Sequence, residues 1–162
     1  WESEGLEMDR EAEWTVDRFP YYGHRMSISQ IIPLQIYNRT AYTLIAETNY
    51  SNHYTFYTEK TVKPIIARRL FVALAGKGHL DNLHKLGFKT FDSIIDESYD
   101  NIEEDVERWD LAIEQVMYLM QKPQDEILFR TIPIVEHNHH VMMTTDWYER
   151  YFQPDFVSYF NQ

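Results

Sequence analysis

The stretch that decides the fold is "TFYTEKTVKPIIARRLFVALAGKGHLDNLHKLGFKTF", residues 55–91. It opens near a Thr-Glu-Lys triplet, continues with apolar residues at helical spacing, and then reaches the apolar run "RLFVALAG" at 69–76. An apolar run of this length is typical of a strand buried on both faces of a parallel sheet. The stretch therefore predicts alternating helix and strand, and its triplet either caps a helix or binds a ligand.

The triplet has the features of a helix start. Thr58 carries a side chain that N-caps prefer, and Glu59 falls in the first turn, where the helix dipole favours an anion. Three residues supply one apolar face: Val62, Ile65 and Ile66. Pro64 lies too deep to be the first helical residue, which predicts an irregular first turn or a kink.

The flanking segments extend the same alternation. "AYTLIAET" at 41–48 indicates a buried strand that ends near Glu47. "GHLDNLHKLG" indicates a short helix stopped by Gly87, and "FKTF" at 88–91 a further short strand. Two strands joined by such a helix form a βαβ unit, so we expect a Rossmann-like parallel sheet with flanking helices in an α/β fold.

The ends of the chain differ from this central part. Residues 1–18 form a strongly acidic lead-in, and we expect 19–162 to be a single α/β domain with C-terminal helices. After Tyr99, apolar residues recur every three or four positions, which predicts a long amphipathic helix stopped at Lys122-Pro123. The next segment predicts another helix, with Pro133 as a candidate break, followed by a short aromatic helix.

Composition excludes several classes of function. The net charge of -11, from 26 acidic and 15 basic residues, argues against a nucleic-acid surface. A small phosphorylated ligand in a locally basic cleft stays compatible with it. The absence of cysteine excludes disulfides, thiolate metal sites and cysteine nucleophiles, and fits a reducing, cytoplasmic setting. Without an apolar run of 18 residues, we expect no membrane span.

The glycine motifs leave two interpretations open. Neither GxGxxG nor GxxxxGK[ST] occurs, so the dinucleotide fingerprint and the P-loop lack their defining motif. "AGKGHL" at 75–80 is still a strand-to-helix turn, where free backbone N–H groups can approach an anion. Gly76 and Gly78 are therefore either ligand-contacting residues or turn glycines, and the second interpretation is favoured.

Clusters of titratable residues also have two interpretations. His137, His139 and His140 invite a metal hypothesis, but their spacing is not that of a zincin, and we expect no metal. Four carboxylates are candidates for a general base: Asp92, Asp96, Glu97 and Asp100. In a chain with 26 acidic residues, solvated surface carboxylates are the favoured interpretation.

The predicted order of strand, loop and helix brings the triplet to a ligand-binding position. Glu47 ends one strand and the triplet begins the next helix, so both lie at the carboxyl ends of strands, where α/β sheets bind ligands. Lys60 can then meet a phosphate and Glu59 can accept from ribose hydroxyls. The alternative is a capped helix with a solvated lysine.

These residues resemble a known family pattern. The nucleotide-sugar half of the fucosyltransferase-type inverting glycosyltransferases carries a Phe-Glu-Asn-Ser strand end, a Tyr-Val-Thr-Glu-Lys helix start and a Val-Pro-Val-Val-x-Gly strand. The counterparts here are "AETN" at 46–49, "FYTEK" at 56–60 and "LFVALAG" at 70–76. The run from about residue 40 to 140 is also similar to uncharacterised glycosyltransferase-like proteins of bacteriophages and marine bacteria.

The resemblance implies the C-terminal half of a two-domain GT-B fold, usually independent of metal, that binds a nucleoside-diphosphate sugar and no other cofactor. Glu47 and Asn49 would flank the donor pocket, Glu59 would contact the ribose and Lys60 the diphosphate. The implied donor-binding residues are Glu47, Asn49, Thr58, Glu59, Lys60 and Gly76.

The chain also departs from the family pattern. The loop between Glu47 and Glu59 is longer, and Ala73 stands where proline or valine is common. The 162 residues suffice for a donor domain but not for an acceptor domain with its catalytic base, so we expect an acceptor domain to be missing on the N-terminal side. The catalytic base stays unassigned.

Two functions from different classes follow. The first is a glycosyltransferase-like domain that binds a nucleotide sugar and, if catalytic, performs an inverting transfer, with Lys60, Arg39 and the helix N-terminus stabilising the diphosphate. The alternative is a non-catalytic phage or bacterial accessory protein that uses its surface aromatics for protein contacts.

Overall fold

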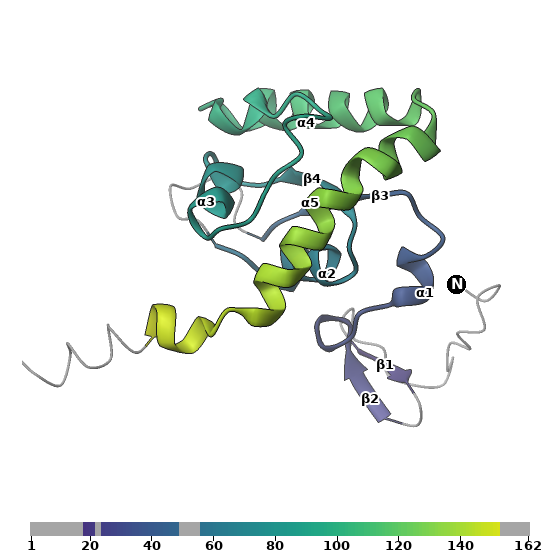
Figure 1. Cartoon of the computed structure of the whole chain (residues 1–162), viewed down its shortest axis with the longest axis vertical. Helices are drawn as coiled ribbons and strands as arrows, with labels where there is room; N and C mark the ends of the chain where they lie inside the picture. The colour runs from purple at the N-terminus through teal and green to yellow at the C-terminus, as the bar shows by residue number, and fades with distance from the viewer. Residues whose placement is uncertain (1–17, 22–23, 49–55, 153–162) are drawn as a thin grey trace, which may run out of the picture.

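The computed structural model describes residues 18–21, 24–48 and 56–152 (Figure 1). Its strands are β1 (Arg18–Tyr21), β2 (His24–Ser27), β3 (Tyr42–Ala46) and β4 (Leu70–Leu74). Its α-helices are α1 (Leu34–Tyr37), α2 (Glu59–Ile66), α3 (His79–Lys85), α4 (Asp105–Met120) and α5 (Gln124–Thr144). Short 3-10 helices lie at Ile28–Gln30 and Ser98–Asn101, and a π-helical turn lies at Tyr148–Phe152.

The central sheet confirms the prediction of a mixed α/β fold with parallel strands. β3 and β4 pair in parallel, from Tyr42 opposite Leu70 to Ala46 opposite Leu74, and α2 is the crossover between them. Within the described residues this sheet has two strands. A separate antiparallel hairpin, formed by β1 and β2, precedes it.

The predicted strand at 88–91 is wrong. The backbone of Lys89 bonds to the side chain of Asn138 on α5, with its N–H donating at 2.8 Å and its C=O accepting at 2.8 Å. A side-chain amide thus satisfies the groups that a neighbouring strand would satisfy. The βαβ unit is therefore β3–α2–β4, and α3 does not lead into a further strand.

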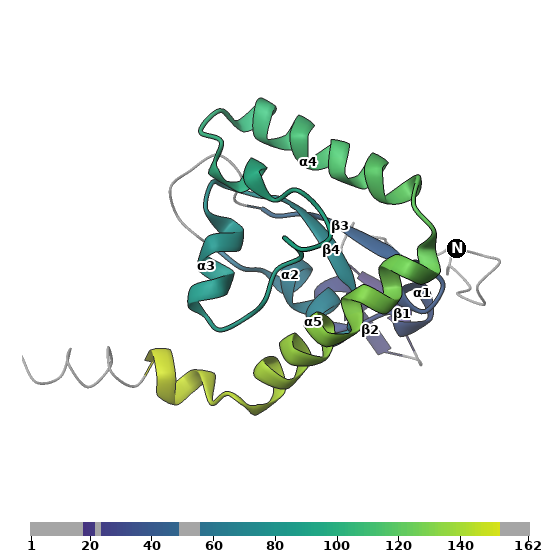
Figure 2. The same cartoon turned by 45° about the horizontal axis from the view of Figure 1, so that its top comes forward.

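The sheet lies between two helical layers. α4 covers one face, and α2 and α5 cover the other, as Figures 1 and 2 show. The core includes Ile45, Leu70, Phe71, Val72, Leu83, Phe91, Ala112 and Leu119, all buried. Phe71 and Phe91 meet edge to face, with their ring centroids 5.2 Å apart. Most of this core comes from the stretch 69–95 and the inner faces of α4 and α5.

The predicted ends of the helices agree with the structure in two places. Thr58 is the N-cap of α2, and its side chain accepts from the backbone N–H of Lys60. α3 ends at Lys85, and Gly87 follows with φ of 96°. The N–H of Phe88 then bonds to the C=O of Leu83 at 3.1 Å, which closes a Schellman motif and explains why glycine stands there.

The two prolines within helices are accommodated without breaks. Pro64 is buried in α2, which ends two residues later at Ile66, so the missing N–H removes a single helical bond, the one to the C=O of Lys60. α5 continues through Pro133, which corrects the candidate break there. Pro133 faces solvent, where water can bond to the carbonyl that the proline leaves unpaired.

The terminal predictions fall partly outside the described residues. Residues 1–17 of the acidic lead-in and 153–162 of the aromatic tail lie outside them. The predicted long helix after Tyr99 is confirmed as α4, although it begins at Asp105, after a 3-10 turn. Over the described part of the chain, no helix combines the length and apolarity that crossing a membrane requires.

Candidate functional site

The carboxyl ends of β3 and β4 meet at one edge of the sheet, because the two strands are parallel. Glu47 directly follows β3, and its N–H donates to the C=O of Leu74 at 2.9 Å. The N-terminus of α2 lies at the same edge, since Thr58 contacts Glu47. This edge brings together the predicted site residues Glu47, Thr58 and Lys60, with Gly76 following β4.

The carboxylate of Glu47 is the centre of this edge. It is 4% exposed and accepts four hydrogen bonds. The donors are Thr58 N–H at 3.1 Å, Thr58 Oγ1 at 2.6 Å, Thr61 Oγ1 at 2.5 Å and Thr48 N–H at 3.3 Å. Both carboxylate oxygens are thus occupied by the protein itself, and Glu47 fixes the start of α2 to the end of β3.

Hydrogen bonding keeps this carboxylate ionised. Burial alone would raise the pKa of Glu47, but the hydroxyl groups of Thr58 and Thr61 and the two backbone donors together bring the pKa below its usual range. Glu47 therefore carries its negative charge at neutral pH. The charge lies beside the N-terminus of α2, where the helix dipole stabilises an anion.

His79 and Tyr57 form the inner wall behind Glu47. Thr61 Oγ1 lies 3.4 Å from His79 Nε2, and the hydroxyl of Tyr57 donates to the C=O of His79 at 2.9 Å. Burial lowers the pKa of His79 to about 4, with a small opposing effect from the charge of Glu47. Because Thr61 gives its proton to Glu47, its oxygen can accept from Nε2–H, so a neutral imidazole completes the chain of bonds.

Lys60 lies at the outer rim of the site. Its side chain is exposed, and its Nζ donates to Thr48 Oγ1 at 2.8 Å. An ammonium group has three donors, so this bond leaves others for a ligand. Glu59 is partly exposed beside it, and its charge acts on Lys63. Asn49, the remaining predicted residue, lies outside the described residues.

The turn after β4 serves the fold. Gly78 is the N-cap of α3 with φ of 76°, a conformation that glycine adopts without strain. The carboxylate of Asp100 accepts from the N–H groups of Leu80 and Asp81, each at 3.1 Å. The chain's own carboxylate therefore occupies the position that an anionic ligand would take at α3. Gly76 is buried at the base of this turn.

Two of the four candidate general bases are not solvated, which corrects the favoured interpretation. Asp92 and Asp96 are exposed, as predicted, but Asp100 is buried against α3. Glu97 is partly buried and accepts from the N–H of Phe91 at 2.8 Å. Burial raises the pKa of Glu97 to about 7, although the hydroxyl of Thr90 and the N–H of Phe91 favour the charged form.

The opposite pKa shifts of His79 and Glu97 predict that these two groups contribute to the pH dependence of stability with opposite signs between pH 5 and 6.5. Unfolding lets His79 bind a proton in this range, because its pKa is about 4 in the folded state and 6.5 otherwise. Unfolding makes Glu97 release one, because its pKa of about 7 returns to 4.5. Each effect amounts to about 1.5 kcal/mol over the interval, with opposite sign, so the two nearly cancel.

Glu97→Gln removes the contribution of Glu97 to the pH dependence of stability and should make the contribution of His79 visible. We expect the unfolding free energy of the variant, measured by urea denaturation, to rise by about 1.5 kcal/mol from pH 5 to 6.5. The control is Asp92→Asn, a substitution of an exposed acid, which should keep the pH profile of the parent chain. A flat profile for Glu97→Gln would contradict the buried, protonated state assigned to Glu97.

Two further candidates lie away from the site. Arg39 follows α1 and precedes β3, so it lies at the amino end of the strand, at the edge opposite Glu47. The predicted role of Arg39 at a diphosphate is therefore wrong. His137 Nε2 lies 2.9 Å from Gly87 O, and His139 Nδ1 lies 3.2 Å from a guanidinium nitrogen of Arg68. No cluster of three potential metal ligands occurs among the residues whose placement is described.

Arg108 of α4 is a buried residue that the sequence reasoning missed. It is 2% exposed, and its guanidinium donates to the C=O of Ala75 at 2.9 Å and of Ile102 at 2.8 Å. It also pairs with Asp105. Arg108 thereby connects the end of β4 to α4, directly beside Gly76. Its position four residues before Ala112, on the inner face of α4, was the signal that could have revealed it.

Comparison of the chain with protein-family models, curated proteins and solved structures finds no match. The function is therefore inferred from the geometry of the site and from the residues that line it.

Proposed function

We propose that this chain binds a nucleoside-diphosphate sugar at the carboxyl edge of β3 and β4, as the donor half of a GT-B glycosyltransferase does. The observation that supports the proposal most strongly is the position of Lys60. Its ammonium group is exposed at the rim, 2.8 Å from Thr48 Oγ1 and beside the N-terminus of α2. A fixed cation at the carboxyl end of a parallel strand suits a diphosphate.

Some residues of the site hold other groups of the protein in place, and others are available to contact the ligand. Glu47 holds the start of α2 in place, because its two oxygens already accept four hydrogen bonds from the protein. Lys60 has donors left for the diphosphate, and Glu59 is exposed enough to accept from a ribose hydroxyl. Phe56, just before α2, is 56% exposed and offers a ring face on which a base can stack.

In the catalytic form of the proposal, an acceptor hydroxyl attacks the anomeric carbon, and the bond from that carbon to the diphosphate oxygen breaks. The negative charge that develops on the diphosphate falls beside Lys60 and the N-terminus of α2, which would stabilise it. The acceptor hydroxyl loses its proton to a base. None of the buried carboxylates at this edge suits that task, since Glu47 and Asp100 are occupied by donors of the protein.

A thermal-shift panel tests the proposal. GDP, UDP and their sugars are added to the chain, and we expect one nucleotide class at 100 times its Kd to raise the Tm by about 5 to 10 °C. Lys60→Met should abolish most of this shift without lowering the Tm of the unliganded chain, because the side chain is exposed. Lys122→Met, which changes an exposed lysine after α4, is the matched control and should keep the shift.

Two outcomes of the thermal-shift panel would contradict the proposal. If no nucleotide or nucleotide sugar shifts the Tm, or if Lys60→Met leaves an observed shift unchanged, the chain does not bind nucleotides at this edge. The alternative role through protein contacts would then be favoured, and it is supported by exposed apolar residues on α4.

A further inference from the structure

The long side of β3 that faces away from β4, which is the lateral edge of the sheet, has no strand partner among the described residues. The N–H of Glu47 points to β4, and backbone groups alternate along a strand, so those of Tyr42, Leu44 and Ala46 point away from it. Exposed edges are usually protected by lysine, proline or a bulge. β3 reads "YTLIA" and has none of these. It therefore presents a regular, uncharged edge that can pair with another strand.

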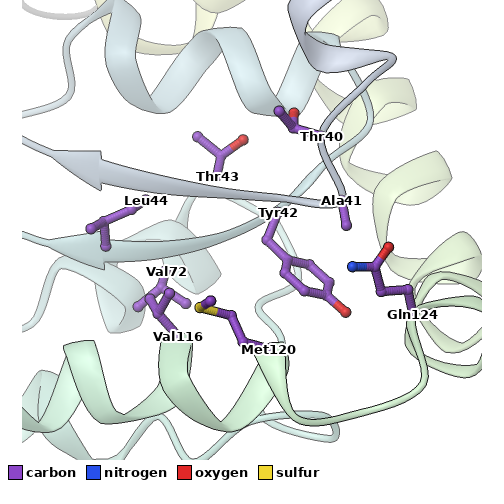
Figure 3. Close-up of a pocket in the computed structure, with 9 residues that line it drawn as sticks. All are labelled: Thr40, Ala41, Tyr42, Thr43, Leu44, Val72, Val116, Met120 and Gln124. Atoms are coloured by element: carbon purple, nitrogen blue, oxygen red, sulfur yellow. The ribbon is translucent and has the colours of Figure 1, made fainter.

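A groove of about 400 Å³ lies beside this edge, between β3 and α4 (Figure 3). Its lining is Thr40, Ala41, Tyr42, Thr43, Leu44, Val72, Val116, Met120 and Gln124. No charged residue is among them, although 25% of the chain is charged. Leu44 is 48% exposed beside the groove, and the hydroxyl of Tyr42 is buried without a partner among the described residues.

α4 adds further apolar surface on the other side of this groove. Four of its apolar residues are exposed: Val106, Ile113, Met117 and Met120. Their spacing of seven, four and three positions puts them on one face of the helix. Met120 lines the groove, so this face lies on the β3 side of α4.

We propose that this edge is the dimer interface of the chain, formed by antiparallel pairing of β3 with β3 of a second copy. A two-fold axis perpendicular to the sheet passes beside Leu44, so Leu44 faces Leu44 of the second copy and Tyr42 faces Ala46 of the second copy. The product is a four-stranded sheet. Both copies of α4 lie on the same face of that sheet, on either side of the axis.

The position of α4 leaves the face of β3 open to a second copy. α4 packs on β4, and Leu44 of β3 stays 48% exposed beside it. Two α4 helices related by the axis are then separated by about three strand spacings of 4.8 Å each. That separation exceeds the interaxial distance of about 8 to 10 Å at which helices pack, so the two helices flank the paired strands without packing against each other.

The charge distribution agrees with self-pairing. A two-fold interface places each residue near its own copy, so charged residues at its centre would repel. The groove and β3 carry none. The rest of the chain carries a net charge of -11, so two copies repel at long range. Added salt screens this repulsion and should strengthen the dimer.

Sedimentation equilibrium of the whole chain tests the dimer. We expect the mass to rise with concentration from 19.6 kDa to twice this value, and to do so at lower concentration in 0.5 M than in 0.05 M NaCl. Leu44→Lys and Met117→Lys should each weaken the dimer at least about tenfold, since the first places like charges together at the axis and the second adds one more positive charge to the apolar surface of each copy beside it. Phe129→Lys, an equally drastic change at an exposed residue of α5, should not.

A single cysteine tests the register. The chain contains no cysteine, so Leu44→Cys introduces one thiol per copy, and the pairing brings the two thiols within reach of one disulfide. We expect copper-phenanthroline to oxidise this variant to a covalent dimer, and Phe129→Cys to remain largely monomeric.

Three results would overturn the proposal. They are a mass of 19.6 kDa at every concentration and salt, a dimer that Leu44→Lys and Met117→Lys leave intact, and an assembly larger than two copies that depends on Leu44. Circular dichroism of each variant checks that it is folded. Leu44 and Met117 are exposed, so both lysine variants are expected to fold as the parent chain does.

Discussion

Replacing Glu47 with alanine is expected to lower the unfolding free energy by about 3 to 5 kcal/mol. The substitution leaves the hydroxyl groups of Thr58 and Thr61 and the N–H of Thr58 without their acceptor at a buried position. Buried donors without partners are costly, and α2 also loses its attachment to β3. Urea denaturation at pH 7 measures the change. We expect the largest loss for any single carboxylate of the site.

Two variants make this result specific. Glu114→Ala removes an exposed carboxylate from α4 and should change stability by less than about 0.5 kcal/mol. Glu47→Gln keeps the shape but offers an amide NH₂ where the protein supplies donors, so we expect a loss of about 2 kcal/mol. A loss below about 1 kcal/mol for Glu47→Ala would mean that Glu47 does not support the fold as described.

Replacing Arg108 with methionine is the second change with a large expected effect. Methionine fills most of the volume, but the C=O groups of Ala75 and Ile102 lose their donor in the interior. Asp105 loses its partner as well. We expect a loss of about 3 kcal/mol in unfolding free energy.

The control for Arg108 carries the same change of charge. Lys89→Met removes one positive charge from an exposed side chain and should be nearly neutral, so it separates the buried contacts from net charge. Both variants are compared by urea denaturation under identical conditions. Equal stability of the two variants would show that the guanidinium of Arg108 does not hold β4 to α4.

The parts of the fold that local patterns determine could be predicted from the sequence. The apolar run at 69–76 became β4, Thr58 caps α2, and Gly87 closes α3. Each depends on residues within a few positions of one another. "FKTF" also reads as a strand locally, but Asn138, 49 residues away, bonds its backbone instead. A partner at that distance leaves no local signal.

The contrast between local patterns and distant partners also explains which parts of the candidate site could be predicted. Glu47, Thr58 and Lys60 were brought together correctly, because the carboxyl ends of consecutive parallel strands meet at one edge. The saturation of Glu47 depends on Thr61, which reads as an ordinary helix residue in the sequence. Likewise, Asp100 caps α3 from 20 residues away. Arg39 was misplaced, although sequence order alone puts it before β3 and therefore at the amino end of that strand.

The measurement that tests the proposed nucleotide site most directly is the residue-by-residue response of the backbone amides to GDP and UDP, followed by ¹⁵N NMR. We predict that the shifting amides cluster at the rim, at Thr48, Glu59 and Lys60, and that Lys60→Met abolishes their response. Amides of Tyr42 and Val116, beside the separate groove at β3, should not move. Shifts confined to that groove, or no shifts at the rim at millimolar nucleotide, would contradict a donor site at the carboxyl edge of β3 and β4.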